Sequence, residues 1–403
     1  MLKVLIADKF EKRGMDELRA AGCDVVYEPD LKDDALREAL GRSGAPVLVV
    51  RGTQVTAAMI EGSAHLGLIV RAGAGFNTID VAAASRHGVL VSNCPGKNAV
   101  AVAELVFGLI LALDRRIVES VVDLRSGAWN KKEYSNARGL KDRTIGLIGM
   151  GTIGQEVARR ARGFEMKVIA WSRSLTKQRA AEYWVQHGDS PADVASKCDI
   201  LSIHLAAAAE TRGIISREVL ELLIPGSYVI NTARADVMDY SALADLMVKR
   251  NLRVGLDVYP DEPSAGQAPF LPAIVKAGGL VYGTHHIGAS TDQAQDAIAE
   301  ETVRIVKEFT ATGQAPNCVN IETRSPARCQ LVLRHFDKVG VLANVLDKLR
   351  RANINVEEMS NTVFQGAKAA VAVIRLAQVP GDAVVKDIAA MKDMVINVEV
   401  KPV

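Results

Sequence analysis

The segment from Arg143 to Ser174 constrains the fold of this chain more than any other stretch. An apolar run, Ile145–Ile148, leads directly into the sequence Gly149-Met150-Gly151-Thr152-Ile153-Gly154. A helical segment with small residues follows, and a second apolar run covers residues 167–171. Strand, glycine turn, helix and strand together fit the length of one βαβ unit, which predicts a dinucleotide-binding turn.

Each glycine of this turn has a distinct expected role. Gly149 makes the tight turn, Gly151 lets backbone N–H groups reach a pyrophosphate, and Gly154 lets the helix lie close to the strand. Thr152 and Ile153 open the helix, whose positive N-terminal end favours phosphate. The alternative is a glycine turn that merely ends a strand, and the two flanking strands favour the dinucleotide site.

The end of the second strand departs from the usual NAD pattern. An NAD site places Asp or Glu there to accept bonds from the ribose hydroxyls, and this chain has Ser172 followed by Arg173. A hydroxyl and a guanidinium suit a 2′-phosphate, which favours NADP slightly over NAD. The alternative is that Arg173 points to solvent and NAD binds without the acid.

The bulk properties exclude several classes of protein. A length of 403 residues allows two or three domains, and a formal net charge of +2 argues against a nucleic-acid-binding surface. The five cysteines are scattered without metal-ligand or redox spacing, so we expect no metal site and a reduced, cytoplasmic setting. Residues 1–8 read as a strand and not as a signal peptide. The apolar stretch Ala99–Leu113 contains Glu104 and is too short to cross a bilayer, so we expect a buried helix and no membrane partner.

Apolar strands alternate with helical segments along most of the chain, which predicts an α/β protein with parallel sheets. Two N-terminal strands end in arginine, Arg51 and Arg71, each followed closely by glycine. The segment Gly73-Ala74-Gly75 could present backbone N–H groups to an anion. A solvated arginine beside an ordinary turn is the alternative.

Polar residues also follow the later strands. They are His204, Asn231 to Arg234, Asp257 and the pair His285-His286. Because the carboxyl ends of parallel strands meet at one edge of a sheet, this pattern predicts a catalytic cleft there.

The last part of the chain has a different order of predicted strands and helices. Residues 313–325 read as a polar linker, and residues 328–401 follow the order βαββαβ, which predicts a ferredoxin-like domain. This domain lacks the aromatic strand signature of RNA-binding domains, so we expect no nucleic-acid partner.

Four motifs in fixed order resemble those of the D-isomer-specific 2-hydroxyacid dehydrogenases. They are the glycine turn 149–154, Asn231-Thr232-Ala233-Arg234, the segment 257–263 (Asp-Val-Tyr-Pro-Asp-Glu-Pro) and the segment 285–291 (His-His-Ile-Gly-Ala-Ser-Thr). The resemblance implies two doubly wound, Rossmann-like parallel-sheet domains. A flavodoxin-like substrate domain would span 1–93 and be completed by 291–320, and an NAD(P)-binding domain would span 94–290. Residues 327–403 resemble an ACT domain, a regulatory ferredoxin-like module.

The resemblance also implies the catalytic residues. Arg234 would hold the substrate carboxylate and polarise the C2 oxygen, His286 would be the general acid/base, and Glu262 would orient the imidazole and stabilise its charged form. The family usually has proline where this chain has His285. We expect His286 to be the catalytic histidine, because Ile-Gly follows it as the family pattern requires.

The resemblance also implies which residues would contact the cofactor and the substrate. Ala233 and His204 would lie near the cofactor, and Asp257 would bond the nicotinamide carboxamide or tune the site. Arg51 would reach the far end of the substrate, Arg71 would lie beside it, and the backbone of Gly73, Ala74 and Gly75 would face its carboxylate.

The C-terminal domain departs from the amino-acid-binding pattern. Family members inhibited by serine have His and then Asn two residues later, whereas here His335 is followed by Asp337, and Asn355 matches another polar contact. An amino-acid effector and a purely structural role in oligomerisation both remain open. The apolar helix 99–113 would pack against its twin in a homodimer or homotetramer.

The resemblance is strongest to members that oxidise 3-phosphoglycerate in the first step of serine synthesis. A glyoxylate or hydroxypyruvate reductase is the alternative within the enzyme class. A non-catalytic NAD(H)-sensing protein similar to corepressors is the alternative outside it, and the intact Arg234, Glu262 and His286 weigh against it.

Overall fold

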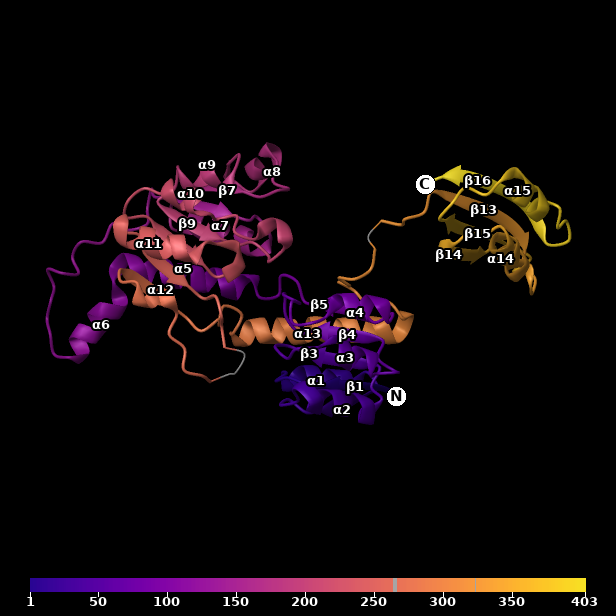
Figure 1. Ribbon diagram of the computed structural model, residues 1–403, viewed down its shortest axis with the longest axis horizontal. Coiled ribbons are helices and arrows are strands. Elements are labelled where there is room, and N and C mark those ends of the chain that lie inside the picture. The colour runs from indigo at the N-terminus through magenta and orange to yellow at the C-terminus, as the bar shows by residue number, and fades with distance from the viewer. Residues whose placement is uncertain (264–266, 323) are drawn as a thin grey trace. The chain divides into compact units, whose positions relative to one another are not determined.

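The computed structural model describes residues 1–263, 267–322 and 324–403 (Figure 1). The chain divides into two compact units, residues 1–320 and residues 321–403. The first unit contains two parallel sheets, and the second contains a smaller antiparallel sheet. The predicted α/β class with parallel sheets is therefore confirmed.

The N-terminal sheet is parallel, with the strand order β2-β1-β3-β4-β5. Its inner strands are apolar except for Lys3 in β1 and Arg71 at the end of β4, because helices cover both faces. Its strands are β1 (Leu2–Ile6), β2 (Cys23–Tyr27), β3 (Val47–Val50), β4 (Leu68–Arg71) and β5 (Leu90–Asn93). Its connecting helices are α1 (Lys12–Ala20), α2 (Asp33–Ser43), α3 (Ala57–Glu61) and α4 (Val81–Arg86).

The long helix α13 (Asp292–Thr312) packs against α1 and β4 of this N-terminal sheet. Its buried Glu301 forms ion pairs with Arg304 and Lys97 and accepts a hydrogen bond from Asn317 at 2.7 Å. The hydrogen bond from Arg304, followed by those from Asn317 and Lys97, outweighs the effect of burial and lowers the pKa of Glu301 to about 2. The cluster ties α13 to the start of helix α5 (Ala99–Arg115).

The second sheet of this unit has seven strands in the order β12-β11-β10-β9-β6-β7-β8. The strands are β6 (Thr144–Ile148), β7 (Lys167–Trp171), β8 (Gln186–His187), β9 (Ile200–Ile203), β10 (Tyr228–Asn231), β11 (Arg253–Leu256) and β12 (Leu280–Gly283). The helices that follow α5 are α6 (Ile117–Arg125), α7 (Thr152–Gly163), α8 (Lys177–Glu182), α9 (Pro191–Ala195), α10 (Arg217–Glu221), α11 (Tyr240–Lys249) and α12 (Ala273–Lys276).

The register of six of these strands, β6, β7 and β9 to β12, aligns their carboxyl ends. Ile148 pairs with Trp171 and Ile203, and Asn231 pairs with Ile203 and Leu256. Leu256 in turn pairs with Gly283. The residues that follow these strands therefore meet along one edge of the sheet, as the sequence pattern predicted.

Helix α5 confirms the buried apolar helix expected at 99–113, and it packs against α7, β10 and β11. The polar sequence of residues 114–141 predicts irregular structure, and this prediction is wrong for part of the segment, because α6 is helical from Ile117 to Arg125. Apolar residues recur there at helical spacing between charged ones, so the charge of the segment masked the periodicity. None of the α6 residues is buried within the chain.

The second unit has the predicted βαββαβ order. Its strands are β13 (Cys329–Phe336), β14 (Val356–Val363), β15 (Ala369–Leu376) and β16 (Val395–Pro402), and its helices are α14 (Val341–Arg351) and α15 (Asp382–Ala389). The sheet is antiparallel, with the order β14-β15-β13-β16. Every second residue of β15 is buried, so one face of the sheet holds the core under the two helices.

Across the described ranges of the chain, no helix combines the length and apolar character that crossing a membrane requires.

Candidate active site

The glycine turn between β6 and α7 is shaped by close backbone contacts. Gly149 has φ +107°, and a Cβ there would lie 2.3 Å from the carbonyl oxygen of His204. A Cβ on Gly154 would lie 2.1 Å from the carbonyl oxygen of Gly149. Side chains are therefore excluded at both positions by neighbouring backbone.

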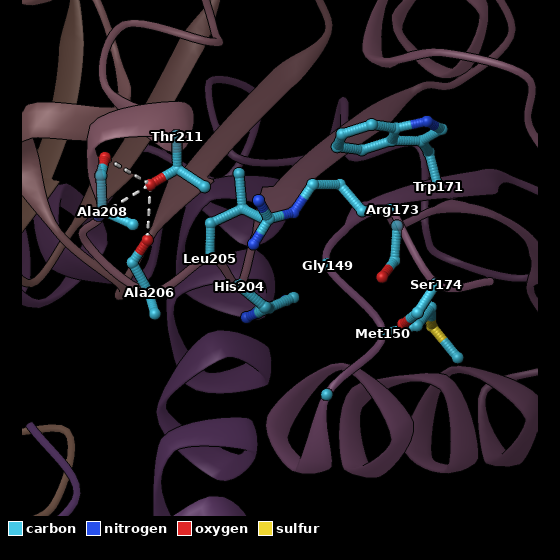
Figure 2. Close-up of a pocket in the computed structure, with 12 residues that line it drawn as sticks. Gly149, Met150, Trp171, Arg173, Ser174, His204, Leu205, Ala206, Ala208 and Thr211 are labelled. Atoms are coloured by element: carbon cyan, nitrogen blue, oxygen red, sulfur yellow. Dashed lines mark hydrogen bonds between the residues drawn. The ribbon is translucent and has the colours of Figure 1, made fainter. Parts of the chain in front are cut away.

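Gly151 differs from these two glycines, because no atom lies within 4 Å of the position that its Cβ would take. It lines a cavity of ≈ 260 Å³ at the N-terminal end of α7 (Figure 2). Thr152, the first residue of α7, is exposed there, while Ile153 packs against the core beside α5. Free N–H groups, open space and a helix N-terminus suit the pyrophosphate of a dinucleotide.

The far side of the cavity is formed by the residues after β7. Ser172, Arg173 and Ser174 line it, together with Trp171. Figure 2 shows the Arg173 side chain extending from β7 toward the segment that contains Thr211. The predicted cofactor residues Gly149, Gly151, Ser172, Arg173 and His204 all line this single cavity.

His204 follows β9, and its ring lies beside Ser202, with 2.9 Å between Nε2 and the serine Oγ. Burial lowers the pKa of His204 to about 3, so the ring is neutral near pH 7. Its Nδ1 has no hydrogen-bond partner within the described ranges. This histidine is therefore a cavity residue and not a proton donor at neutral pH.

Arg234 is positioned by the buried side chain of Asn231 at the end of β10. The Asn231 Oδ1 accepts from the N–H of Ala233 at 3.0 Å, and its Nδ2 donates to the carbonyl of Arg234 at 2.9 Å. The Arg234 guanidinium lies against the N-terminal half of the unit, since a Cβ on Gly75 would be 2.3 Å from its Nη2. Burial lowers the pKa of Arg234, and nearby Glu262 opposes that effect.

Glu262 and His286 form the expected acid–imidazole pair. Nδ1 of His286 lies 2.7 Å from Oε2 of Glu262, and Oε1 of Glu262 accepts from the N–H of Tyr259 at 2.7 Å. Burial alone would raise the pKa of Glu262, but the bonds from His286 and Tyr259 outweigh it, and the pKa is lowered. The glutamate is thus ionised near neutral pH and holds the ring by Nδ1, which leaves Nε2 for a substrate.

Asp257 supports the loop that carries the histidine. Its carboxylate is buried and accepts from the Thr284 hydroxyl at 2.6 Å, the Ile287 N–H at 2.8 Å and the Gly288 N–H at 2.8 Å. His286 lies just before these two N–H groups and has φ +53°, a left-handed conformation that non-glycine residues rarely adopt. Of the two roles expected for Asp257, these bonds favour tuning of the site over contact with the nicotinamide.

Two further arginines lie at the carboxyl ends of β3 and β4. A Cβ on Gly73 would lie 1.6 Å from Nη1 of Arg71, so this side chain lies on the glycine backbone. Burial, followed by the charges of Arg234 and Arg51, lowers the pKa of Arg71 to about 10. The structure thus places the guanidiniums of Arg234 and Arg51 within electrostatic reach of Arg71.

The loops around these arginines are fixed by polar residues that sequence reasoning did not single out as site residues. Asp8, which follows β1, accepts from the N–H groups of Arg51, Gly52 and Thr53. Asn93, which ends β5, donates to the carbonyl of Ala74 at 2.5 Å. The available signal was a polar residue at or near the carboxyl end of a strand, an acid for Asp8 and an amide for Asn93.

In the described residues, no hydrogen bond or ion pair joins the three positions expected to bind an effector in the second unit. His335 is buried, and its Nε2 lies 3.0 Å from Oδ1 of Asn361. Asp337 is exposed, and Asn355 donates to Glu357. Asn361, on β14, is the polar partner of His335 that the sequence pattern did not indicate.

Comparison with known proteins agrees with this geometry. Residues 107–288 match the family described as D-isomer specific 2-hydroxyacid dehydrogenase, NAD binding domain. The chain is 31% identical over 361 residues to the D-3-phosphoglycerate dehydrogenase of Methanocaldococcus jannaschii, covering 89% of this chain and 67% of that protein. It is 39% identical over 266 residues to the hydroxypyruvate reductase of Thermotoga maritima, covering 65% of this chain and 84% of that protein.

The fold comparison points the same way. The crystal structure of NAD+-bound 3-phosphoglycerate dehydrogenase from Entamoeba histolytica superposes with a TM-score of 0.65 at 25% identity, covering 79% of this chain and 99% of that one. The chain spans about two thirds of the length of the curated phosphoglycerate dehydrogenases it matches. From the match to the NAD-binding domain and these relatives, the chain belongs to the D-isomer-specific 2-hydroxyacid dehydrogenases, a family of oxidoreductases that use a nicotinamide dinucleotide.

Proposed function

We propose that this protein oxidises a phosphorylated D-2-hydroxy acid at C2, with 3-phosphoglycerate as the substrate. The observation that carries the proposal is the group of guanidiniums around Arg71, whose pKa is lowered by burial and then by the charges of Arg234 and Arg51. Within the described residues, none of the three forms an ion pair with a carboxylate of the chain. A substrate with two anionic ends would supply the missing negative charge.

The reaction requires charge stabilisation at the substrate carboxylate and oxygen. Arg234 matches a planar carboxylate with its fork of donors, and the same guanidinium stabilises negative charge that develops on the C2 oxygen. Because the arginine is partly buried and held by Asn231, it is oriented before the substrate binds.

The proton of the C2 hydroxyl would go to Nε2 of His286. Glu262 fixes the ring through Nδ1 and stabilises the imidazolium that results. The glycine turn and the lining of the cavity beside it, with Ser172 and Arg173, would hold a nicotinamide dinucleotide, and that group would supply the acceptor for the hydride from C2. In the reverse direction the same imidazolium returns the proton to the oxygen of a 2-oxo acid.

The proposal assigns a separate role to each domain of the chain. Residues 1–93 with 291–320 would bind the substrate, residues 94–290 would bind the dinucleotide, and residues 327–403 would form an ACT regulatory domain. The buried His335 and the exposed Asp337 are the groups in that domain which an amino-acid effector would meet. The unburied α6, whose apolar side chains include Val122 at 59% exposure, is consistent with a homodimer or homotetramer.

A hydroxypyruvate or glyoxylate reductase is the second candidate. The 39% identity to the Thermotoga maritima enzyme favours it, and such substrates need Arg234 but not a distal phosphate ligand. A non-catalytic dinucleotide sensor is disfavoured, because the acid–imidazole bond at 2.7 Å serves no purpose in dinucleotide binding alone.

A substrate panel tests the proposal. Purified protein is assayed with 3-phosphoglycerate, hydroxypyruvate and glyoxylate against both nicotinamide cofactors, and we expect the largest kcat/KM with 3-phosphoglycerate. Arg51→Ala is expected to raise KM for this substrate and to leave KM for glyoxylate unchanged. An unaltered KM for 3-phosphoglycerate would remove Arg51 from the phosphate site.

A histidine pair provides the catalytic control. His286→Ala should abolish turnover, whereas His285→Ala, at the exposed neighbouring position, should retain it. Full activity in His286→Ala would exclude the assigned general acid/base, whichever substrate is used.

A further inference from the structure

The two loops that carry the proposed catalytic groups follow neighbouring parallel strands, β10 and β11. One loop leads from β10 to α11 and contains Arg234, and the other follows β11 and contains Glu262. The last backbone bond at this end of the strand pair runs from the N–H of Asp257 to the carbonyl of Asn231, at 3.0 Å. In the described part of the chain, no further backbone hydrogen bond joins the two loops. Their separation is therefore set by groups other than the strand pairing.

The hydroxyl of Tyr240, the first residue of α11, connects the two loops. It donates to the carbonyl of Val258 at 2.6 Å and accepts from Nδ2 of Asn231 at 3.3 Å. The same Nδ2 also donates to the carbonyl of Arg234 at 2.9 Å. One amide thus links the tyrosine to the backbone of the catalytic arginine.

On the other loop, the bonded carbonyl lies between two residues that support the acid–imidazole pair. Asp257, just before Val258, accepts from N–H groups of the segment that follows His286. The N–H of Tyr259, just after Val258, donates to Glu262 at 2.7 Å. Fixing the carbonyl of Val258 therefore fixes the backbone from which both supports extend.

The tyrosine is itself held in place and remains a donor. Asp239 caps α11 by accepting from the N–H of Ala242 at 2.8 Å, which fixes the backbone beside the tyrosine. The ring of Tyr240 is partly buried and packs against the apolar core of the seven-stranded sheet. Burial raises the pKa of Tyr240 and outweighs the hydrogen bond from Asn231, so the hydroxyl keeps its proton near neutral pH.

We infer that Tyr240 is a positioning residue, whose hydroxyl holds the loop of Arg234 and the loop of Glu262 at the separation that one substrate requires. The inference rests on the proposed function, in which Arg234 binds the carboxylate and His286, held by Glu262, takes the proton. Both contacts have to be made to the same small molecule, so a change in the separation lowers the rate even when each group keeps its own partner. The hydroxyl acts through these groups and does not itself contact the substrate, because it is already bonded to Val258 and Asn231.

Tyr240→Phe removes the hydroxyl and keeps the ring. The carbonyl of Val258 loses its donor, and Nδ2 of Asn231 loses one of its two acceptors. We expect kcat to fall about 10-fold, the effect of one lost buried hydrogen bond, and KM for the acid to change about 2-fold or less, because Arg234 still meets the carboxylate. The dissociation constant of NADH, measured by fluorescence titration, should stay as in wild type, since Tyr240 is not among the described residues that line the cofactor cavity.

Tyr228→Phe is the matched control. Tyr228 lies at the opposite end of β10 from Asn231, and its hydroxyl donates to the buried carboxylate of Asp114 at 2.9 Å. This variant should lower the melting temperature at least as much as Tyr240→Phe does, and it should leave kcat and KM unchanged. If Tyr240→Phe gives the same pattern as the control, the role of Tyr240 is structural and the inference is wrong.

A double-mutant cycle tests whether Tyr240 acts through the catalytic pair. In the background of Glu262→Gln, Tyr240→Phe should lower kcat about 3-fold or less, because the imidazole that the separation serves has already lost its support. Two effects that multiply fully would show that the sites are independent and would overturn the inference.

The assay uses the substrate of the panel that wild type turns over fastest, so the two proposals fail in different ways. A preference for hydroxypyruvate or glyoxylate would refute 3-phosphoglycerate as the substrate, and a lowered kcat in Tyr240→Phe would still support the positioning role. A wild-type kcat in Tyr240→Phe would refute the positioning role and leave the proposed substrate standing. A wild type that turns over none of these acids would refute both.

Discussion

Replacing Gly75 with alanine is expected to remove most of the catalytic efficiency while leaving the fold intact. The new Cβ would lie 2.3 Å from Nη2 and 3.6 Å from the Cζ of Arg234. The next nearest atom is Oδ1 of Asn77 at 3.4 Å, an ordinary contact. Gly75 does not have a positive φ, so alanine fits its backbone without strain.

The size of the effect follows from the displacement that the methyl group requires. Non-bonded heavy atoms need roughly 3.5 Å, so the guanidinium must move by about 1 Å. A misplacement of about 1 Å at a positioning group costs on the order of 100-fold in rate, or about 2.7 kcal/mol in the activation free energy. We therefore expect kcat/KM for the 2-hydroxy acid to fall about 100-fold, because the displaced Arg234 no longer meets the substrate carboxylate.

The assay is steady-state kinetics together with thermal unfolding of the same preparation. Gly41→Ala is the matched control, since no atom lies within 4 Å of its added methyl and it lies inside α2. It should stabilise the fold by about 0.5–1 kcal/mol and leave kcat/KM unchanged. If Gly75→Ala keeps kcat/KM near the wild-type value, Arg234 is not the group that orients the substrate.

Three further substitutions test the supporting contacts. Glu262→Gln leaves either the N–H of Tyr259 or the Nδ1–H of His286 without an acceptor, and it should lower kcat/KM about 10- to 100-fold at pH 7. Asp261→Asn, a substitution at the exposed neighbouring position, should match wild type. Glu301→Gln should lower the free energy of unfolding by about 2 kcal/mol at pH 7. The hydrogen bond from Arg304, together with those from Asn317 and Lys97, holds the pKa of Glu301 at about 2. The contribution of Glu301 to the free energy of unfolding is therefore complete above about pH 4.5 and is lost as the pH falls toward 2. Urea unfolding should therefore show the two proteins converging at low pH, and a constant difference would contradict the assignment. Asp257→Asn should lower both kcat and the melting temperature, because an amide nitrogen cannot accept from the N–H groups of the loop. A rise in KM with kcat and melting temperature unchanged would argue against a supporting role.

Local signals were sufficient for the elements with strong periodicity. The turn 149–154 was predictable because glycine spacing, an apolar strand and a helix start coincide within one βαβ unit. In the second unit, β13 and β15 bury every second residue, and this period of two was visible in the sequence as strands. Helix α6 was missed because its apolar residues are not covered by the chain, and a charged segment without a buried face resembles a loop.

The sequence predicted the site residues that belong to motifs. It did not predict the contacts that form where the fold brings distant loops together. Arg234, Glu262 and His286 came from motifs, but the sequence did not indicate that Gly75 supports Arg234. The ion pair between Arg173 and Glu210 likewise depends on two loops whose separation is set by the sheet, and pattern reasoning gives no distance between loops.

The acids and the arginines of the candidate site differ in their partners, and this difference supports the anionic substrate that we propose. The carboxylates of Asp8 and Asp257 accept from backbone N–H groups, and that of Glu262 accepts from one N–H and from the imidazole. Because these acids are already engaged, they do not neutralise the guanidiniums beside them by direct pairing. Arg71 and Arg234 are consequently held charged and partly desolvated at a depressed pKa, which makes an incoming carboxylate or phosphate the most favourable partner for them. In the function that we propose, the engagement of these acids by the backbone would therefore have two effects: it would hold the catalytic groups in place, and it would leave the positive charge free to attract the substrate.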